Sequence, residues 1–203
     1  MNNLFKQLVT TIFLAVSGLP GTLLADSNSD NGPSPSASAQ LDFRITIPGV
    51  LRFQVGTAGS GNVDIIDFAP PAATLGDGTD TQGTGGNLGN GVVTVDLFSN
   101  AGQVTITESN NSSGAGLDNG SGDFIPYSEI VTTSSDATNF AAPTLSDNGG
   151  GTSTPTPTSG NNKVTNRTES WSYAYDNSTD YPEGTYGGVN TQGGRVTYTA
   201  ATP

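Results

Sequence analysis

The chain of 203 residues contains no cysteine and no histidine. The lack of cysteine excludes disulfides and thiol chemistry, and the lack of histidine excludes Ser-His-Asp triads and histidine-based zinc sites. Basic residues are scarce too: the chain has six Lys and Arg and 18 Asp and Glu, which gives a net charge of −12. A surface of this sign repels nucleic acids and anionic membranes. We therefore expect no nucleic-acid partner and no membrane contact for the mature form.

Helical patterning is also missing from the sequence. No segment repeats its apolar residues with a helical period over even ten positions. The chain instead has 28 glycines, with turn clusters spaced at roughly 8–15 residues, as in sandwiches and barrels. The sequence therefore predicts an all-β fold, an immunoglobulin-like antiparallel β-sandwich. The Cys…Trp…Cys signature of antibody domains is absent, so that likeness is one of architecture.

The segment Met1–Ala25 has the features of a secretory signal peptide. Lys6 supplies the positive charge, an apolar run extends from Leu8 to Leu24, and the small residue Ala25 follows it. Pro20 interrupts the run, whereas a spanning helix needs about 20 continuous apolar residues. Removing this segment, and Lys6 with it, leaves five basic against 18 acidic residues and hence a net charge of −13. The polar stretch Asp26–Ala39 is predicted to be a flexible leader.

An alternating segment follows the leader. Its large apolar residues occupy every second position, which places them on one face of an extended strand. These residues are Leu41, Phe43, Ile45 and Ile47. The alternation resumes in Val50–Val55, after Pro48-Gly49. Two interpretations are open, namely a strand that is exchanged with another chain and an ordinary first strand of a complete domain.

Further strands are predicted where apolar or aromatic residues alternate between turn clusters. They are Val63–Phe68, Val92–Phe98, Gln103–Glu108, Phe124–Thr132, Ser170–Tyr175 and Arg195–Ala200. The residues Ser99–Gly102 predict a hairpin that joins the second of these strands to the third. Pro126 predicts an edge strand or a bulge. The Gly-, Asn-, Ser- and Thr-rich stretches between the strands are predicted loops, above all Ala72–Asn90 and Asp147–Asn162.

Two sets of side chains are candidates for binding or catalysis. Trp171, Tyr173 and Tyr175 share one face of a strand, and we interpret them as core residues in preference to a sugar-stacking surface. Paired carboxylates can hydrolyse glycosides, and the nearest pairs are Asp64 with Asp67, Asp118 with Asp123, and Asp176 with Asp180. These pairs lie in or beside loops where Asp commonly forms turns. We therefore predict no enzyme, no cofactor and no dedicated metal site.

The end of the chain carries a family resemblance. Gly184-Thr185-Tyr186 precedes a last strand that contains Val196-Thr197-Tyr198. This combination resembles the C-terminal end of chaperone–usher pilin subunits, in particular the archaic branch with the spore-coat-type secreted pilins. Leu41–Val55 resembles the opening of bacterial fimbrial proteins. The chain departs from the family in having no disulfide, a polar leader before the first strand, and longer loops.

The resemblance implies an incomplete β-sandwich that lacks one strand. In such pilins a periplasmic chaperone covers the gap, and the N-terminal donor strand of the next subunit then replaces it. Carried over to this chain, residues 40–48 hold the donor strand, with Leu41, Phe43, Ile45 and Ile47 as its anchors. Residues 49–203 form the pilin domain, Pro48 and Gly49 are the hinge, and the C-terminal strand presents Val196, Tyr198 and Ala200.

The function implied by the resemblance is that of a structural subunit of an extracellular pilus that serves adhesion or biofilm formation. Its expected partners are adjacent copies of itself, a periplasmic chaperone and an outer-membrane usher. It would be secreted through the periplasm to a fibre on the cell surface. The alternative is a secreted carbohydrate-binding or adhesin β-sandwich that does not polymerise.

Overall fold

The computed structural model describes residues 28–59 and 61–203, so the predicted signal peptide lies outside the described residues. The chain divides between Ile47 and Pro48 into an N-terminal unit and a body, Pro48–Pro203. Residues 28–47 contain one bend and no strand or helix. Leu41–Ile47 was expected to be a strand, and it forms none within the described chain.

The body is built of antiparallel strands. The described residues contain no α-helix, and their helical structure is one 3-10 turn, η1, at Tyr127–Glu129. None of the described residues forms a helix long and apolar enough to cross a membrane. The predicted all-β class is therefore confirmed, with antiparallel pairing in every sheet.

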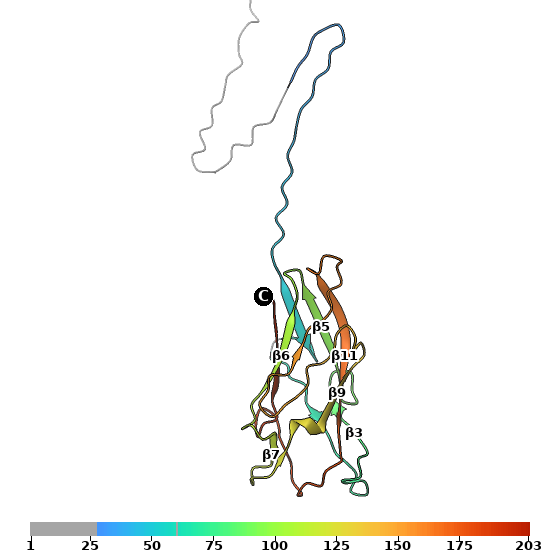
Figure 1. Ribbon diagram of the computed structural model, residues 1–203, viewed down its shortest axis with the longest axis vertical. Helices are drawn as coiled ribbons and strands as arrows, with labels where there is room; N and C mark the ends of the chain where they lie inside the picture. The colour runs from blue at the N-terminus through green and yellow to red at the C-terminus, as the bar shows by residue number, and fades with distance from the viewer. Residues whose placement is uncertain (1–27, 60) are drawn as a thin grey trace, which may run out of the picture. The chain divides into compact units, whose positions relative to one another are not determined.

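The larger sheet is centred on two long strands, β5 (Val92–Ser99) and β11 (Thr165–Tyr175), which pair with each other (Figure 1). β1 (Leu51–Val55) pairs with β5. β9 (Ile130–Ser134) and the short β3 (Thr81–Gln82) pair with β11. Strict alternation explains β5, because every second residue from Val93 onward is buried while its neighbours are only half-buried.

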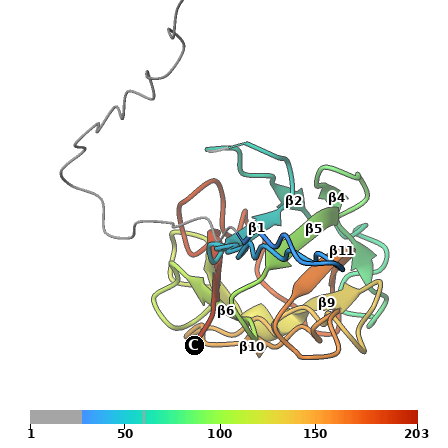
Figure 2. The ribbon, with the colours of Figure 1, turned by 90° about the horizontal axis from the view of Figure 1, so that it is seen from above.

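The smaller sheet has the order β10-β6-β12 (Figure 2). β6 spans Thr105–Asn110 and β12 spans Val196–Ala201, and the two are paired along their full lengths. β10 is only Thr152–Ser153. Two further pairs of two-residue strands complete the body, and they are β2 (Ile66–Asp67) with β4 (Thr84–Gly85), and β7 (Leu117–Asp118) with β8 (Phe124–Ile125).

Side chains from both sheets share one core. Trp171 of β11 is fully buried, and its ring makes edge-on contacts with Phe140 and with Tyr198 of β12, at centroid distances of 5.8 and 5.2 Å. Tyr173 and Tyr175 follow on the same face and are also buried. The interpretation of these aromatics as core residues is thus confirmed.

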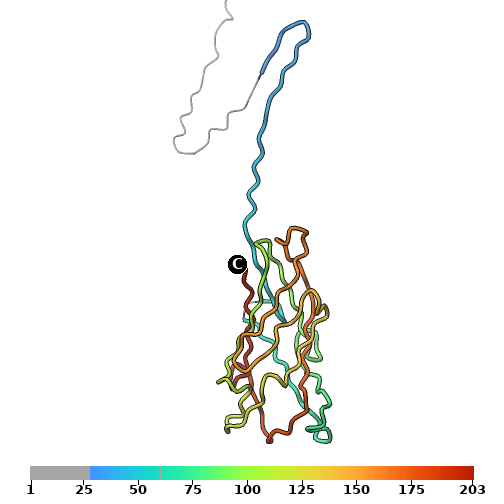
Figure 3. Tube along the Cα trace, viewed as in Figure 1, coloured from blue at the N-terminus to red at the C-terminus, as the bar shows by residue number. Residues whose placement is uncertain are grey.

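The predicted hairpin between β5 and β6 is wrong. The two strands lie in different sheets, and the chain crosses between them through residues 100–104, as the tube in Figure 3 shows. The physical reason is that both edges of β5 are already occupied, by β1 and by β11. Gly102 N donates to Lys163 O at 3.3 Å, which ties the connection to the chain entering β11.

Three other predicted boundaries change. Only Ile66–Asp67 of the predicted strand Val63–Phe68 is paired, because its partner β4 is equally short. Pro126 breaks Phe124–Thr132 into β8, η1 and β9, with Pro126 itself extended before η1. The predicted loops Ala72–Asn90 and Asp147–Asn162 contain short strands, β3 and β4 in the first and β10 in the second.

Candidate functional site

The N-terminal unit carries four exposed apolar side chains. Leu41, Phe43, Ile45 and Ile47 are 75, 86, 85 and 75 % exposed. Residues 41–47 form no strand in the described chain. Side chains of this size usually leave water, and a run of four that stays exposed points to an interaction surface.

β1 offers one free edge. Among the described strands it pairs only with β5, from Leu51 opposite Ser99 to Val55 opposite Val95. Phe53 and Val55 face the core but remain half-buried, and they pack against its margin. The row of main-chain donors and acceptors on the far side of β1 has no strand partner within residues 28–59 and 61–203.

β12 offers a second free edge. Its only strand partner in the described chain is β6. Val196, Tyr198 and Ala200 form its inward face, and all three are half-buried beside the core. The Tyr198 hydroxyl lies 3.0 Å from that of Tyr173. Burial raises the pKa of Tyr198 well above its usual value, and the neighbouring Tyr173 adds to the rise.

The two free edges lie near each other. β1 starts opposite Ser99 and β12 ends opposite Thr105, so both of these strand ends lie at the end of the body where β5 crosses to β6. The strands therefore run in opposite directions. Their Cα atoms approach to within 8 Å, yet no hydrogen-bonded ladder joins them. We call these two unpaired edges, with their half-buried residues, the open edges.

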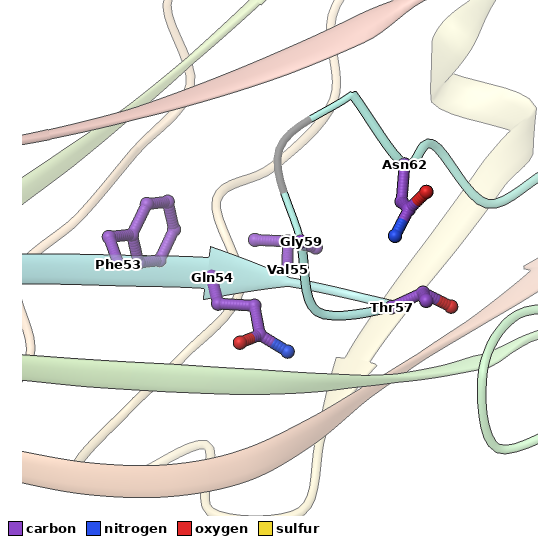
Figure 4. Close-up of a pocket in the computed structure, with 6 residues that line it drawn as sticks. All are labelled: Phe53, Gln54, Val55, Thr57, Gly59 and Asn62. Carbon is purple, nitrogen blue, oxygen red and sulfur yellow. The ribbon is translucent and has the colours of Figure 1, made fainter.

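A pocket of about 360 Å³ lies at the C-terminal end of β1 (Figure 4). Its lining residues are Phe53, Gln54, Val55, Thr57, Gly59 and Asn62. Asp64 shapes the adjacent loop, because its carboxylate accepts hydrogen bonds from the main chain and the hydroxyl of Thr57, at 2.6 and 2.7 Å. Gly56 has a φ of +79°, and a Cβ there would lie 2.1 Å from the Asp64 carboxylate, so only glycine fits.

Three of the six acidic candidates, Asp64, Asp118 and Asp123, accept hydrogen bonds from nearby residues of the chain. Asp118 accepts from Gly120 N at 2.6 Å, and Asp123 accepts from the Asn119 side chain at 2.9 Å. Within the described residues no three acidic side chains gather where they could hold a metal ion.

Two residues of this region were missed from the sequence. The side chain of Asn100 accepts from Val50 N at 2.6 Å and donates to Pro48 O at 2.9 Å. Nothing local in the sequence indicates this contact, because it joins positions that lie far apart along the chain. Glu108 is fully buried on the inward face of β6, opposite Tyr198. The sequence did carry a signal for this burial, because Glu108 continues the every-second-residue pattern of Val104 and Ile106, whose side chains face inward.

The described residues combine an exposed alternating segment with two open edges, which are the features that strand addition uses. No protein-family model, curated protein or solved structure significantly matches this chain.

Proposed function

We propose that this protein is a structural subunit of an extracellular fibre, a chaperone-assembled pilus of a Gram-negative bacterium serving adhesion or biofilm formation. Leu41–Ile47 of one subunit would add as a strand to the open edges of the next. One observation carries the proposal: four alternating apolar side chains, each at least 75 % exposed, belong to a segment without a strand partner in its own described chain.

The strand order supports an incomplete immunoglobulin-like sandwich. Constant-type domains place strands A, B, E and D in one sheet and C, F and G in the other. Along the chain, β1, β5, β6, β9, β11 and β12 take the places of A to F. The sheet order β1-β5-β11-β9 then matches A-B-E-D, and the pair β6-β12 matches C-F. The position of strand G, beside the free edge of β12, has no occupant in the described chain. A donor strand would fill that position.

The direction of the donor determines the kind of assembly. β12 runs toward the end of the body where β1 starts. A donor antiparallel to β12 therefore places its Ile47 near Val196, and its own body beyond the opposite end of the acceptor. Each subunit then gives its strand at one end and accepts at the other, which produces an open head-to-tail chain. A parallel donor would favour a closed pair.

Insertion requires a small opening. Paired strands lie about 4.7–4.9 Å apart, so a strand between β1 and β12 needs a separation of roughly 9.5 Å. The Cα atoms of the two strands approach within 8 Å, so the edges must part at that point. We expect a periplasmic chaperone to hold them apart and an outer-membrane usher to exchange its strand for the donor.

The alternative of a non-polymerising carbohydrate-binding sandwich receives no support from the aromatic face. Trp171 is fully buried, and Tyr173 and Tyr175 are each 8 % exposed. The ladder that would stack on sugar rings is therefore part of the core.

The test is imaging of the natively secreted protein and of two deletions. Removal of Asp26–Ala39 takes only the polar leader, and fibres should persist. Removal of Asp26–Ile47 also takes the donor segment, and it should yield subunits, soluble or chaperone-bound, that do not form chains. Normal fibres from the longer deletion would overturn the proposal.

A further inference from the structure

Asn100 brackets the point at which the N-terminal segment joins the body. Its side chain accepts a hydrogen bond from Val50 N at 2.6 Å and donates one to Pro48 O at 2.9 Å. Its own main-chain N–H donates to Val50 O at 3.1 Å. These three bonds continue the β1–β5 contact beyond Leu51, where the ladder proper begins, and they fix the chain on both sides of Gly49.

The bracketed segment has the residues of a tight turn. In Ile47-Pro48-Gly49-Val50, proline and glycine occupy the two central positions that favour a type II turn. Such a turn would fold Leu41–Ile47 back along the free edge of β1. The free edge of β1 is also where we propose that the donor strand of a neighbouring subunit binds. The subunit's own segment would compete with that donor, and it has the higher effective concentration because it belongs to the same chain. A subunit completed by its own segment could not join a chain.

The side-chain pattern opposes the shortest version of this turn. A two-residue loop would set Ile47 opposite Val50, and therefore Arg44 opposite Phe53. Directly opposed residues share a face, so Arg44 would point toward the core and Ile45 would lie beside Arg52 on the outer face. Arg52 lies on that outer face, with its guanidinium 5.1 Å from the Phe98 ring. A shift of one residue reverses the two faces.

A three-residue loop, Pro48–Val50, restores the correct face. It sets Ile47 opposite Leu51 and Ile45 opposite Phe53, with all four side chains inward. The common form of this loop ends in a residue with left-handed φ, here Val50, whereas the Val50 that Asn100 holds is not among the residues with positive φ. The Asn100 bracket therefore acts against the shortest turn that would let the subunit complete itself.

Gly49 in the bracketed conformation has no need to be glycine. It is not among the residues with positive φ. A Cβ at this position would meet the Ala101 Cβ at 3.6 Å, an ordinary contact. Alanine should therefore fit here, and Gly49→Ala should leave the Asn100 bracket intact.

We propose that Asn100 is a positioning residue that selects addition of Leu41–Ile47 to a neighbour over addition to its own body. This inference rests on the proposed function. Loss of the two side-chain hydrogen bonds should favour the folded-back form by roughly fivefold to a hundredfold.

The experiment compares the natively secreted chain with its Asn100→Ala and Gly49→Ala variants. Fibre yield is measured by sedimentation, and amide hydrogen exchange of Leu41–Ile47 is measured in the monomer fraction. Asn100→Ala should lower the fibre yield at least severalfold and protect these amides in the monomer. Gly49→Ala, which leaves the bracket intact, should keep the parent yield.

Asn87→Ala is the matched control. The Asn87 side chain also makes two hydrogen bonds, but both are with Thr94 of β5: it accepts from Thr94 N at 2.8 Å and donates to Thr94 Oγ1 at 2.9 Å. It makes no bond to Pro48–Val50. It should leave fibre yield and exchange unchanged. Normal fibre yield from Asn100→Ala would overturn the inference, and so would lost fibres with unprotected amides. The proposed function fails separately, if fibres survive deletion of Asp26–Ile47.

Discussion

Glu108 is a carboxylate fully buried in the core. Its Oε1 accepts a hydrogen bond from Asn110 Nδ2 at 2.9 Å, whereas Oε2 has no hydrogen-bond partner among the described residues. A buried charge without an ionic partner is costly to the folded state. Glu108 and the Tyr198 beside it lie under the free edge of β12, so this cost falls on the region where the donor is proposed to bind.

We predict that Glu108→Gln stabilises the subunit. Glutamine can keep the contact with Asn110 and cannot ionise, so it avoids the cost of burying a carboxylate, and we expect the unfolding free energy to rise by about 1–3 kcal/mol. Denaturant unfolding of monomeric subunits measures the change. Glu183→Gln, at an exposed position, is the control and should have little effect. An unchanged or lower stability of Glu108→Gln would contradict the prediction.

A second prediction concerns alkaline pH. Burial raises the pKa of Tyr173 to about 12, partly offset by its hydrogen bond with Tyr198. A tyrosine in the unfolded chain titrates near 10. Between these values the unfolded chain loses the proton first, so stability falls as pH rises from 10 to 12, by about 2 kcal/mol for this group.

Denaturant midpoints measured from pH 8 to pH 12 test this dependence. Tyr173→Phe removes the ionising hydroxyl, so the decline above pH 10 should be shallower in the variant than in the parent. Equal slopes would show that Tyr173 does not contribute.

At the scale of elements, the donor segment depends on which face meets the acceptor. Burial of its four apolar side chains would contribute roughly 6–12 kcal/mol, at about 1.5–3 kcal/mol each. Ile45→Asp places a carboxylate in that interface, at a desolvation cost of several kcal/mol. We predict that it prevents stable assembly, whereas Asp42→Ala on the opposite face leaves fibres intact. Imaging and sedimentation of both variants test the prediction, and equal effects would contradict it.

The strands themselves were largely predictable, because alternation is a local property. β1, β5, β6 and β12 begin and end within about two residues of their predicted limits. Their pairing was not predictable. Ser99–Gly102 has hairpin residues, but the long-range ladders from β5 to β1 and β11 leave no edge for β6. The bracket formed by Asn100 likewise depends on partners, Pro48 and Val50, that are distant from it in the sequence.

At the scale of the whole molecule, stability should belong largely to the assembly. The chain has no disulfide, and the donor contribution is comparable to the total stability of an ordinary domain, about 5–15 kcal/mol. We therefore predict that isolated subunits melt far below the fibre. Thermal scans of monomer and fibre provide the measurement. Coincident melting would indicate that Leu41–Ile47 adds nothing to a neighbour.

Charge also acts at this scale. Without the predicted signal peptide, the chain has five basic and 18 acidic residues and a net charge of −13. Since association with DNA relies on neutralising phosphates, we predict no measurable binding to duplex DNA. Fluorescence anisotropy at low salt, where attraction is strongest, is the most sensitive assay. A salt-sensitive interaction at micromolar concentration would contradict it.

The sequence by itself determined the all-β class, the apolar face of each main strand and the one-sided pattern of Leu41–Ile47. These features follow from the period-two alternation of apolar residues and from the lack of helical periodicity. Only the tertiary structure showed that β5 and β6 lie in different sheets and that β1 and β12 each have an edge with no strand partner in the described residues. It also showed that the Asn100 side chain is hydrogen-bonded to Pro48 and Val50. The physical reason is that a strand's pattern specifies which face is buried, whereas its partner depends on which edges the rest of the chain has already occupied.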